Sequence, residues 1–313
     1  STAAGSGADA ANGNAGADAI SFAASLAGKT ITLTGGELAI TNDLSINGDV
    51  NGDGKADITI SGDGKSRVFA IYGAAQDVDL LSLTLTGGNS GGSDGGAIYA
   101  GGVASLTIAD TTISGSTADE GGGVSLLSSG LTMVNSLVSG NSGSGFGGGI
   151  YMTGGSTALL VNSTVYGNTS GSSGGGISAY AGSALTLQNS TITGNSTTSS
   201  GGGIENFSST LTVLNSVVAG NSVIFGSPDV IGDVNSATNS FFGVAVGIVS
   251  GSNNFNGGGD PLLGELLDNG GTVLTLSPLD GEALIGTGSN AALPLDIFDI
   301  DGDGDTAEVR GVA

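Results

Sequence analysis

Several residue types are missing or scarce in this sequence of 313 residues. It has no cysteine, tryptophan or histidine, and only 4 prolines and 5 basic residues. The lack of cysteine excludes disulfides and thiolate metal sites. Aromatic residues make up only 4% of the chain, which indicates an aliphatic and narrow core. No run approaches the ~18 apolar residues of a membrane span. Ser1 opens a polar, alanine-rich stretch without a signal peptide, so we expect a mature or excised chain, or export by a signal elsewhere.

Charge is strongly one-sided. The net charge is −23, from 28 acidic and 5 basic residues, and no lysine or arginine occurs from Val68 to Val309. Nucleic-acid binding requires cations that neutralise phosphates, and anionic membranes repel such a surface. Divalent cations outside the cell would offset the self-repulsion. We therefore predict an extracellular or bacterial cell-surface location, with no nucleic-acid partner and no membrane insertion.

An internal repeat is the main structural signal. The chain contains 62 glycines, yet 38% of its residues are hydrophobic and recur at regular intervals, so it has a core to bury. The motif Gly-Gly-(Ala/Gly)-(Ile/Val) occurs five times at spacings of 26 or 27 residues, ending at Ile98, Val124, Ile150, Ile177 and Ile204. Each period holds three short alternating strands, which is the layout of one β-helix coil, and coils stack ~4.8 Å apart.

The alternation within a period predicts which side chains point inward. In the coil that starts at Gly147, parity directs Ile150, Met152, Leu159, Val161 and Val165 into the core. Stacking turns each inward position into a ladder, one of which is Ile98, Val124, Ile150, Ile177 and Ile204, and another Ile113, Val138, Val165, Ile192 and Val218. The sequence predicts an all-β, single-stranded, right-handed parallel β-helix of about ten coils, with 26–27 residues in each central coil.

Asparagine also recurs at the coil period. One column is Asn135, Asn162, Asn189 and Asn215, and a second is Asn141, Asn168, Asn195 and Asn221, with Ser116 earlier in the same place. The first column keeps the inward parity of the strand before it, so we interpret it as a buried asparagine ladder at a corner. Asn162, Asn168, Asn189 and Asn195 also match the N-glycosylation pattern, but recurrence at the coil period favours the structural interpretation.

The repeat divides the chain into three parts of one domain, 1–313. We expect irregular coils over 1–90, regular coils over 91–227, and irregular coils with a cap over 228–313. All four prolines lie after residue 227, and proline cannot donate to a strand ladder.

Two acidic loops have the ligand spacing of a calcium site. Oxygen ligands stand at positions 1, 3, 5, 7 and 9 of the first loop, and glycine at position 6, as in an EF-hand but without its glutamate at position 12. The predicted ligands are Asp49, Asn51, Asp53, the Lys55 carbonyl and Asp57, and in the second loop Asp299, Asp301, Asp303 and Asp305. The competing interpretation is a pair of solvated acidic turns.

The repeats resemble a known family of bacterial surface sequences. The segments GGAIY, GGGIY and GGGIS, followed by LTLxNSTITGN-like runs, resemble polymorphic outer-membrane protein repeats, although the FxxN half of that motif is not evident. The tail DPLLGELLDNGGTVLTLSPLDGEALIGTGSN, followed by DIDGDGDTAEVRG, resembles the choice-of-anchor Q region. The resemblance implies a pectin-lyase-like β-helix in a secreted or surface-attached bacterial protein, without a defined activity.

Catalysis has little support in the sequence. A polysaccharide lyase needs a base, commonly Lys, Arg, His or Tyr, and the repeat region has none of the first three. The tyrosines Tyr72, Tyr99, Tyr151, Tyr166 and Tyr180 remain, without a basic partner to activate one of them or to bind an acidic sugar. A glycoside hydrolase needs two carboxylates ~5–9.5 Å apart. Asp94 and Glu120 are the only acidic pair in register with the repeat, and they could equally be solvated turn residues.

An ice-binding face would need unbroken threonine columns, which Leu137, Tyr166, Val217 and Ala219 interrupt. We therefore predict a non-catalytic structural or adhesive module, stabilised by Ca²⁺. Its predicted partners are other copies or tandem modules of the same protein, or an extracellular glycan or protein.

Overall fold

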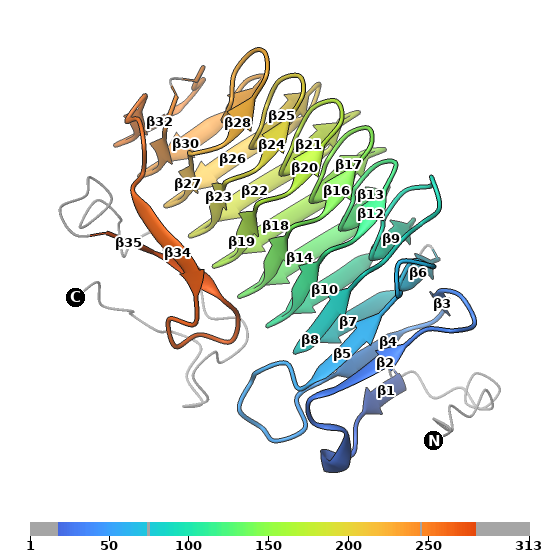
Figure 1. The fold of residues 1–313 in the computed structure, drawn as a ribbon. Coiled ribbons are helices and arrows are strands. Elements are labelled where there is room, and N and C mark those ends of the chain that lie inside the picture. The colour runs from blue at the N-terminus through green and yellow to red at the C-terminus, as the bar shows by residue number, and fades with distance from the viewer. Residues whose placement is uncertain (1–17, 74–75, 245, 280–313) are drawn as a thin grey trace.

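The chain forms a stack of flat coils that runs in one direction from the N-terminal to the C-terminal side (Figure 1). The computed structural model describes residues 18–73, 76–244 and 246–279. Each coil contributes strands to parallel sheets that run along the whole stack, and the two longest sheets contain ten strands each. The predicted parallel β-helix of about ten coils is thereby confirmed.

Three long sheets form the walls of the stack. Sheet 1 consists of β1 (Asp18–Ser21), β4 (Leu44–Asn47), β7 (Asp77–Leu81), β10 (Ser105–Ala109), β14 (Gly130–Val134), β18 (Thr157–Val161), β22 (Ala184–Gln188), β26 (Thr210–Leu214), β30 (Ser236–Thr238) and β32 (Gly251–Ser252). Sheet 2 consists of β2 (Lys29–Thr32), β5 (Ile58–Ser61), β8 (Leu83–Thr86), β11 (Thr112–Ser114), β15 (Leu137–Ser139), β19 (Thr164–Tyr166), β23 (Thr191–Thr193), β27 (Val217–Val218), β31 (Phe241–Phe242) and β33 (Phe255–Asn256). Sheet 3 consists of β3 (Leu38–Ile40), β6 (Phe69–Tyr72), β9 (Ile98–Gly101), β13 (Val124–Leu127), β17 (Ile150–Thr153), β21 (Ile177–Tyr180), β25 (Ile204–Phe207) and β29 (Val230–Ile231).

The remaining described elements are short. A small parallel sheet consists of β12 (Thr117–Ala118), β16 (Ser142–Gly143), β20 (Thr169–Ser170), β24 (Ser196–Thr197) and β28 (Ser222–Val223). An antiparallel hairpin follows the last coil and consists of β34 (Leu263–Leu267) and β35 (Thr275–Pro278). A 3-10 turn, η2 (Ala24–Leu26), completes the set. Within the described residues, no helix has the length and hydropathy needed to cross a membrane.

The two predicted aliphatic ladders are confirmed. Ile98, Val124, Ile150, Ile177 and Ile204 pair in register along sheet 3, and Ile113, Val138, Val165, Ile192 and Val218 pair along sheet 2. All ten side chains are fully buried. In-register stacking of β-branched and aliphatic side chains therefore builds one continuous core through the coils.

The predicted parity of the sheet 1 strand is wrong by one residue. In β18 the side chains in the main core are Ala158 and Leu160, whereas Leu159 and Val161 belong to a separate small apolar cluster outside it. The error arises at the next residue, since Asn162 has a φ of 49°. That left-handed residue turns the chain through a corner, so the strict alternation of a strand does not continue through it. A prediction that starts from an inward Asn162 and alternates back along β18 therefore places Leu159 and Val161 on the wrong face of the strand.

The predicted ladder of Asn135, Asn162, Asn189 and Asn215 is confirmed in its hydrogen bonding and wrong in its burial. Asn162 Nδ2 donates to Asn135 Oδ1 and Asn135 Nδ2 to Asp110 Oδ1, both at 3.3 Å, but the column does not point into the core. All four residues are left-handed and only half-buried. The inward place belongs to the following serine, as in Ser136 and Ser163, which are buried. The Ser136 N–H donates to Ser163 Oγ at 3.2 Å, and Ser163 Oγ donates to the Val161 carbonyl at 2.8 Å. A hydroxyl at this corner satisfies backbone groups that no strand ladder reaches.

The buried amide ladder is formed by the second column, Asn141, Asn168, Asn195 and Asn221. In each step a backbone N–H and a side-chain Nδ2 both donate to the Oδ1 of the next asparagine, at 2.9–3.1 Å. The ladder ends at Asp229, whose Oδ1 accepts both donors of Asn221 and whose Oδ2 accepts the Val244 N–H at 2.7 Å. A carboxylate has only acceptors, so Asp229 can accept hydrogen bonds from both Asn221 and the Val244 N–H. An asparagine in its place would point its NH₂ donor at the Val244 N–H, which is also a donor. Full burial of Asn168 and Asn195 also excludes these two glycosylation candidates.

The amide ladder predicts a clear contrast between two asparagines of one coil. Asn168→Ala should lower the free energy of unfolding by about 2–4 kcal/mol, because it strands the buried donors of Asn141 and the Val138 carbonyl. Asn162→Gly, which suits the left-handed backbone of the half-buried corner, should cost less than about 1 kcal/mol. Denaturant unfolding of the two variants measures both values, and equal costs would contradict the assignment of the ladder.

Candidate functional site

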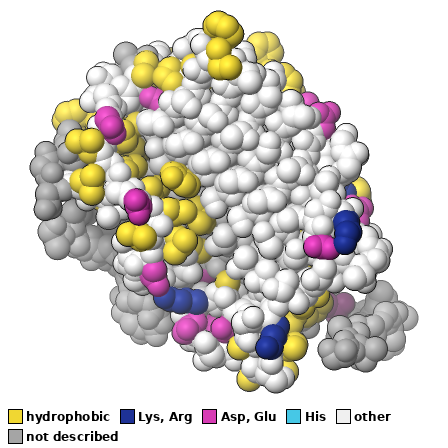
Figure 2. Space-filling view, viewed as in Figure 1, with side chains coloured by type: hydrophobic (Ala, Val, Ile, Leu, Met, Phe, Trp, Pro, Cys, Tyr) yellow, Lys and Arg dark blue, Asp and Glu magenta, His cyan; other side chains and the backbone are white. Residues whose placement is uncertain are grey.

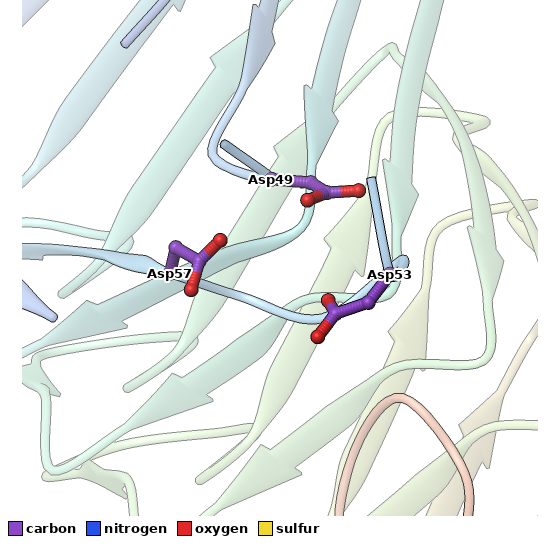
Figure 3. Close-up of side chains that lie close together, drawn as sticks. All are labelled: Asp49, Asp53 and Asp57. Atoms are coloured by element: carbon purple, nitrogen blue, oxygen red, sulfur yellow. The ribbon is translucent and has the colours of Figure 1, made fainter. Parts of the chain in front are cut away.

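The first predicted calcium loop brings three carboxylates together. Asp49, Asp53 and Asp57 each have an oxygen within 4.8 Å of an oxygen of the other two, and Figure 3 shows that they come from the beginning, middle and end of the loop. The loop connects β4 to β5, where a long connection interrupts the flat coil. Hard oxygen ligands at this separation fit one Ca²⁺ ion better than Zn²⁺, which prefers nitrogen and sulfur.

Backbone hydrogen bonds hold the loop in shape. Asp49 accepts N–H groups of Asn51, Gly52 and Gly54 at 2.7–3.0 Å, and Asp57 accepts the Val50 N–H at 3.0 Å. Burial raises the pKa of Asp49, but the backbone hydrogen bonds together outweigh it, so the pKa lies below its usual range. Asp49 therefore remains a carboxylate with unused lone pairs for a cation.

The other predicted ligands have different positions. Asn51 lies in the same loop, where its Oδ1 accepts the Asp53 N–H at 2.9 Å and its Nδ2 donates to Asp53 Oδ2 at 3.3 Å. The ammonium group of Lys55 leaves the loop and pairs with Asp268 at 3.4 Å. The second loop, Asp299, Asp301, Asp303 and Asp305, lies outside the described residues.

The C-terminal hairpin reaches the first acidic loop. β34 runs back along the stack beside the strands of sheet 2 (Figure 1), and the turn after it carries Asp268 and Thr272. Thr272 Oγ1 donates to Asp110 Oδ1 at 2.6 Å, next to the Lys55–Asp268 ion pair. A cleft of about 390 Å³ between the turn and the coils is lined by residues that include Asp53, Lys55 and Asn135. The first loop and the hairpin therefore form one junction on the side of the stack.

An aromatic strip follows the outer surface of sheet 3. We use this name for the rings of Tyr72, Tyr99, Phe146, Tyr151, Tyr180 and Phe207. Ring centroids are 5.6 Å apart for Tyr72 and Tyr99, 5.2 Å for Phe146 and Tyr180, and 5.1 Å for Tyr180 and Phe207. Tyr151 is largely buried beside Phe146 and Tyr180, whereas Tyr72 is 44% and Phe207 58% exposed.

Three carboxylates, those of Asp94, Asp119 and Glu120, lie close together beside the strip. Asp94 and Glu120 occupy the same turn in adjacent coils, since the Gly95 N–H donates to the Glu120 carbonyl. Burial, then the charge of Asp119, raises the pKa of Asp94, and burial, then the charge of Asp94, raises that of Glu120. Glu120 also forms a hydrogen bond with Tyr151, and burial together with the Glu120 charge raises the pKa of Tyr151 to about 12. The predicted register of Asp94 and Glu120 on adjacent coils is confirmed.

Glu205 is the carboxylate that the sequence analysis missed. It is only 8% exposed and accepts hydrogen bonds from Ser178 Oγ at 2.6 Å and Tyr180 OH at 3.1 Å. Burial raises its pKa above the usual range in spite of these donors. The signal was present in the repeat, because Glu205 follows a ladder isoleucine as Tyr99 and Tyr151 do. The outward residue that follows each ladder residue of sheet 3 also forms a column along the stack, and the sequence analysis did not consider that column.

The strip contains one basic side chain in the described part of the chain, and that side chain is already engaged. The Arg67 guanidinium lies 5.4 Å from the Tyr99 ring centroid. It donates to the Gly95 and Asp94 carbonyls at 2.8 and 2.7 Å and pairs with Glu37. Arg67 is 8% exposed, so it fixes the N-terminal end of the strip and leaves no free cation for an acidic sugar.

The outer surface of sheet 2 has a different character. Its threonine columns are interrupted as the sequence indicated, and the hairpin lies beside them, since Leu263 and Leu276 line clefts together with Thr191, Thr193 and Val217. In Figure 2 most of the visible face is neutral and polar, and lysine and arginine appear only over the N-terminal coils. A broad flat threonine lattice for ice is therefore not present on the described part of sheet 2.

Comparison with known proteins identifies the fold. A family model described as the right handed beta helix region matches residues 69–257, from β6 to the end of β33 and thus more than half of the chain. The search of curated proteins and the search of solved structures each returned no match.

Glu205 predicts a specific pH dependence of stability. Because its pKa is raised in the folded state, the folded chain binds this proton more tightly than the unfolded chain. The resulting stability is complete below the unfolded pKa and is lost as the pH rises through the folded pKa. Thermal unfolding of Glu205→Gln should therefore depend less on pH between 4 and 8 than that of the unchanged protein. Identical slopes for Glu205→Gln and the unchanged protein would contradict the prediction.

Proposed function

Because the chain belongs to the right-handed β-helix family, whose fold alone does not determine an activity, we propose that it is a non-catalytic structural or adhesive module. We place it in a secreted or surface-attached bacterial protein and assign calcium a stabilising role. Its partners would be copies or tandem modules of the same protein, or an extracellular glycan or protein.

The observation that carries this proposal is the continuity of the interior. The amide ladder from Asn141 to Asp229 and the serine corner ladder run beside unbroken aliphatic columns. In the amide ladder the backbone and side-chain donors of each asparagine meet one acceptor on the next coil, which favours a rigid rod with a fixed coil spacing. Such a rod suits a part that presents a surface and carries load.

Glycoside hydrolysis is the second candidate, and Asp94 with Glu120 is the observation in its favour. Neighbouring coils are ~4.8 Å apart, close to the carboxylate separation of about 5–5.5 Å in retaining glycosidases. Such an enzyme needs environments that push the two pKa values apart. Here burial raises the pKa of both Asp94 and Glu120, and the Glu120 carboxylate is tied to Tyr151. This similarity of environment favours the non-catalytic alternative.

An extracellular location is supported by charge and by motif. The net charge of −23 suits an exterior rich in divalent cations, and the absence of cysteine is compatible with bacterial secretion. The resemblance of the glycine repeats and of the tail to bacterial surface sequences points to the same place.

Calcium binding is supported by the first loop. Three carboxylates converge without a basic side chain among them, because Lys55 pairs outward with Asp268. Like charges so close together repel each other unless a cation joins them. The loop would supply Asp49, Asp53 and Asp57, with Asn51 and the Lys55 carbonyl beside them, and calcium would contribute a fixed bridge between β4 and β5.

The non-catalytic proposal predicts a negative result with a defined readout. The full chain, incubated with pectin, alginate and neutral β-glucans, should release no unsaturated products and no new reducing ends. Turnover that disappears in Asp94→Asn or Glu120→Gln, while both variants keep the melting temperature of the unchanged protein, would establish the hydrolase alternative in its place.

The calcium proposal predicts stabilisation by mass action. At a hundredfold excess of free calcium over its Kd, folding should gain about 2.7 kcal/mol, and magnesium should be less effective because the loop offers few geometrically ideal octahedral ligands. Calorimetry with chelator and with calcium measures the increment. Asp53→Ala should reduce it, whereas Asp63→Asn, in the next exposed acidic turn, should retain it. Coincident melting curves with and without calcium would show that the loop is an ordinary acidic turn.

A further inference from the structure

The aromatic strip has an internal rhythm of two coils. In one outward column of sheet 3, Tyr99 and Tyr151 alternate with Ser125 and Ser178. In the neighbouring column, Tyr72 and Leu127 alternate with Gly101 and Thr153. The large side chains of the two columns are out of step, so they form a zigzag along the stack. Two coils correspond to ~10 Å. This alternation extends from β6 to β17, whereas Tyr180 and Phe207 pair directly on adjacent coils.

The strip is accessible and apolar where the rings emerge. Tyr72, Leu127 and Phe207 are 44%, 42% and 58% exposed, and Tyr180 packs against Phe207. Ring faces of this kind stack on flat apolar faces and attract cations. From β6 to β25 the strip crosses six strands of sheet 3, so it suits an extended polymer better than a compact molecule.

The negative charge beside the strip indicates which kind of polymer it can bind. Asp94 and Glu120 stand at its edge with Asp119 beside them, and the basic side chain of the strip, Arg67, is bound to Glu37 and to backbone carbonyls. A polyanion would meet uncompensated carboxylates, whereas ammonium groups would pair with them. The ligand should therefore carry positive charge together with flat, weakly polar faces.

We propose that the aromatic strip binds an extended amino-sugar polymer, with an ammonium group at the adjacent carboxylates of Asp94 and Glu120 and sugar rings against Tyr180 and Phe207. This inference rests on the adhesive role proposed above. Tyr180 and Phe207 pair on adjacent coils, and the coil spacing of ~4.8 Å is similar to the length of one pyranose ring in an extended β-1,4-linked chain. An extended basic peptide repeats its side chains on one face every ~6.6 Å and falls out of step with this one-coil spacing.

Titration of the full chain with a hexamer of β-1,4-linked glucosamine tests the proposal. The N-acetylated hexamer, which lacks the ammonium groups, should bind at least about tenfold more weakly, since it forfeits the charge pairs. Phe207→Ala, at an exposed ring, should lower the affinity for glucosamine about tenfold at unchanged net charge. Glu120→Gln, which retains a hydrogen-bonding side chain beside Tyr151, should lower it by a similar factor.

Matched controls separate the strip from the general acidity of the chain. Asp233→Asn removes one exposed carboxylate elsewhere and should change the affinity less than twofold. An equal loss in Asp233→Asn and Glu120→Gln would overturn the proposal, as would equal affinity for the acetylated hexamer or tighter binding of a lysine hexapeptide. Bound glucosamine that is also cleaved would refute the non-catalytic function and leave the ligand class standing. Absence of binding, with all variants folded by thermal melting, would refute the ligand and leave the structural role.

Discussion

In-register stacking of parallel strands is the constraint on which the whole molecule depends. Once each coil hydrogen-bonds to the next at a fixed spacing, every position of the repeat becomes a column, and a side chain is chosen to match its neighbours above and below. Aliphatic residues satisfy this requirement by shape. Buried asparagines satisfy it by donating twice to one oxygen, from backbone and side chain together, as Asn168 does to Asn195. An amide can repeat indefinitely because it both gives and accepts, and the row ends only where Asp229 supplies acceptors alone.

Side chains on the outer surface of the stack do not have to match their neighbours in the coils above and below. The left-handed corner at Asn135 or Asn162 separates an inward serine from an outward amide within two residues, so one turn contributes to the core and to the surface. On sheet 3 the outward columns hold rings and carboxylates, which nothing in the coil itself requires. Surface chemistry can therefore change from coil to coil while the interior stays uniform, and this is why the fold accommodates different functions.

Periodicity predicted the columns within each strand and failed at the corners, and features outside the repeat were found only where their residues are close in sequence. The aliphatic ladders at Ile150 and Val165 followed from spacing and alternation alone, and so did the parallel β-helix. The parity of Leu159 and Val161 was wrong, because alternation assumes continuous strand geometry and the corner at Asn162 interrupts it. Asp49, Asp53 and Asp57 were found from their spacing because the loop is local. Glu205 escaped notice, since its partners Ser178 and Tyr180 belong to the preceding coil and only the register connects them.

The hairpin is the feature furthest from any sequence rule, and it changes the mechanics of the stack. A solenoid held only by nearest-neighbour contacts can open from either end, since each coil depends on the adjacent one alone. The hairpin leaves the last coil, returns along sheet 2 and joins Asp268 to Lys55 and Thr272 to Asp110, across more than 160 residues of chain. A single exposed ion pair contributes little, but a strap that spans many coils couples their opening. Loss of the terminal coil then requires loss of contacts near the first ones. The acidic loop that holds Asp49, Asp53 and Asp57 lies at this junction, so order in that loop supports both ends of the stack at once.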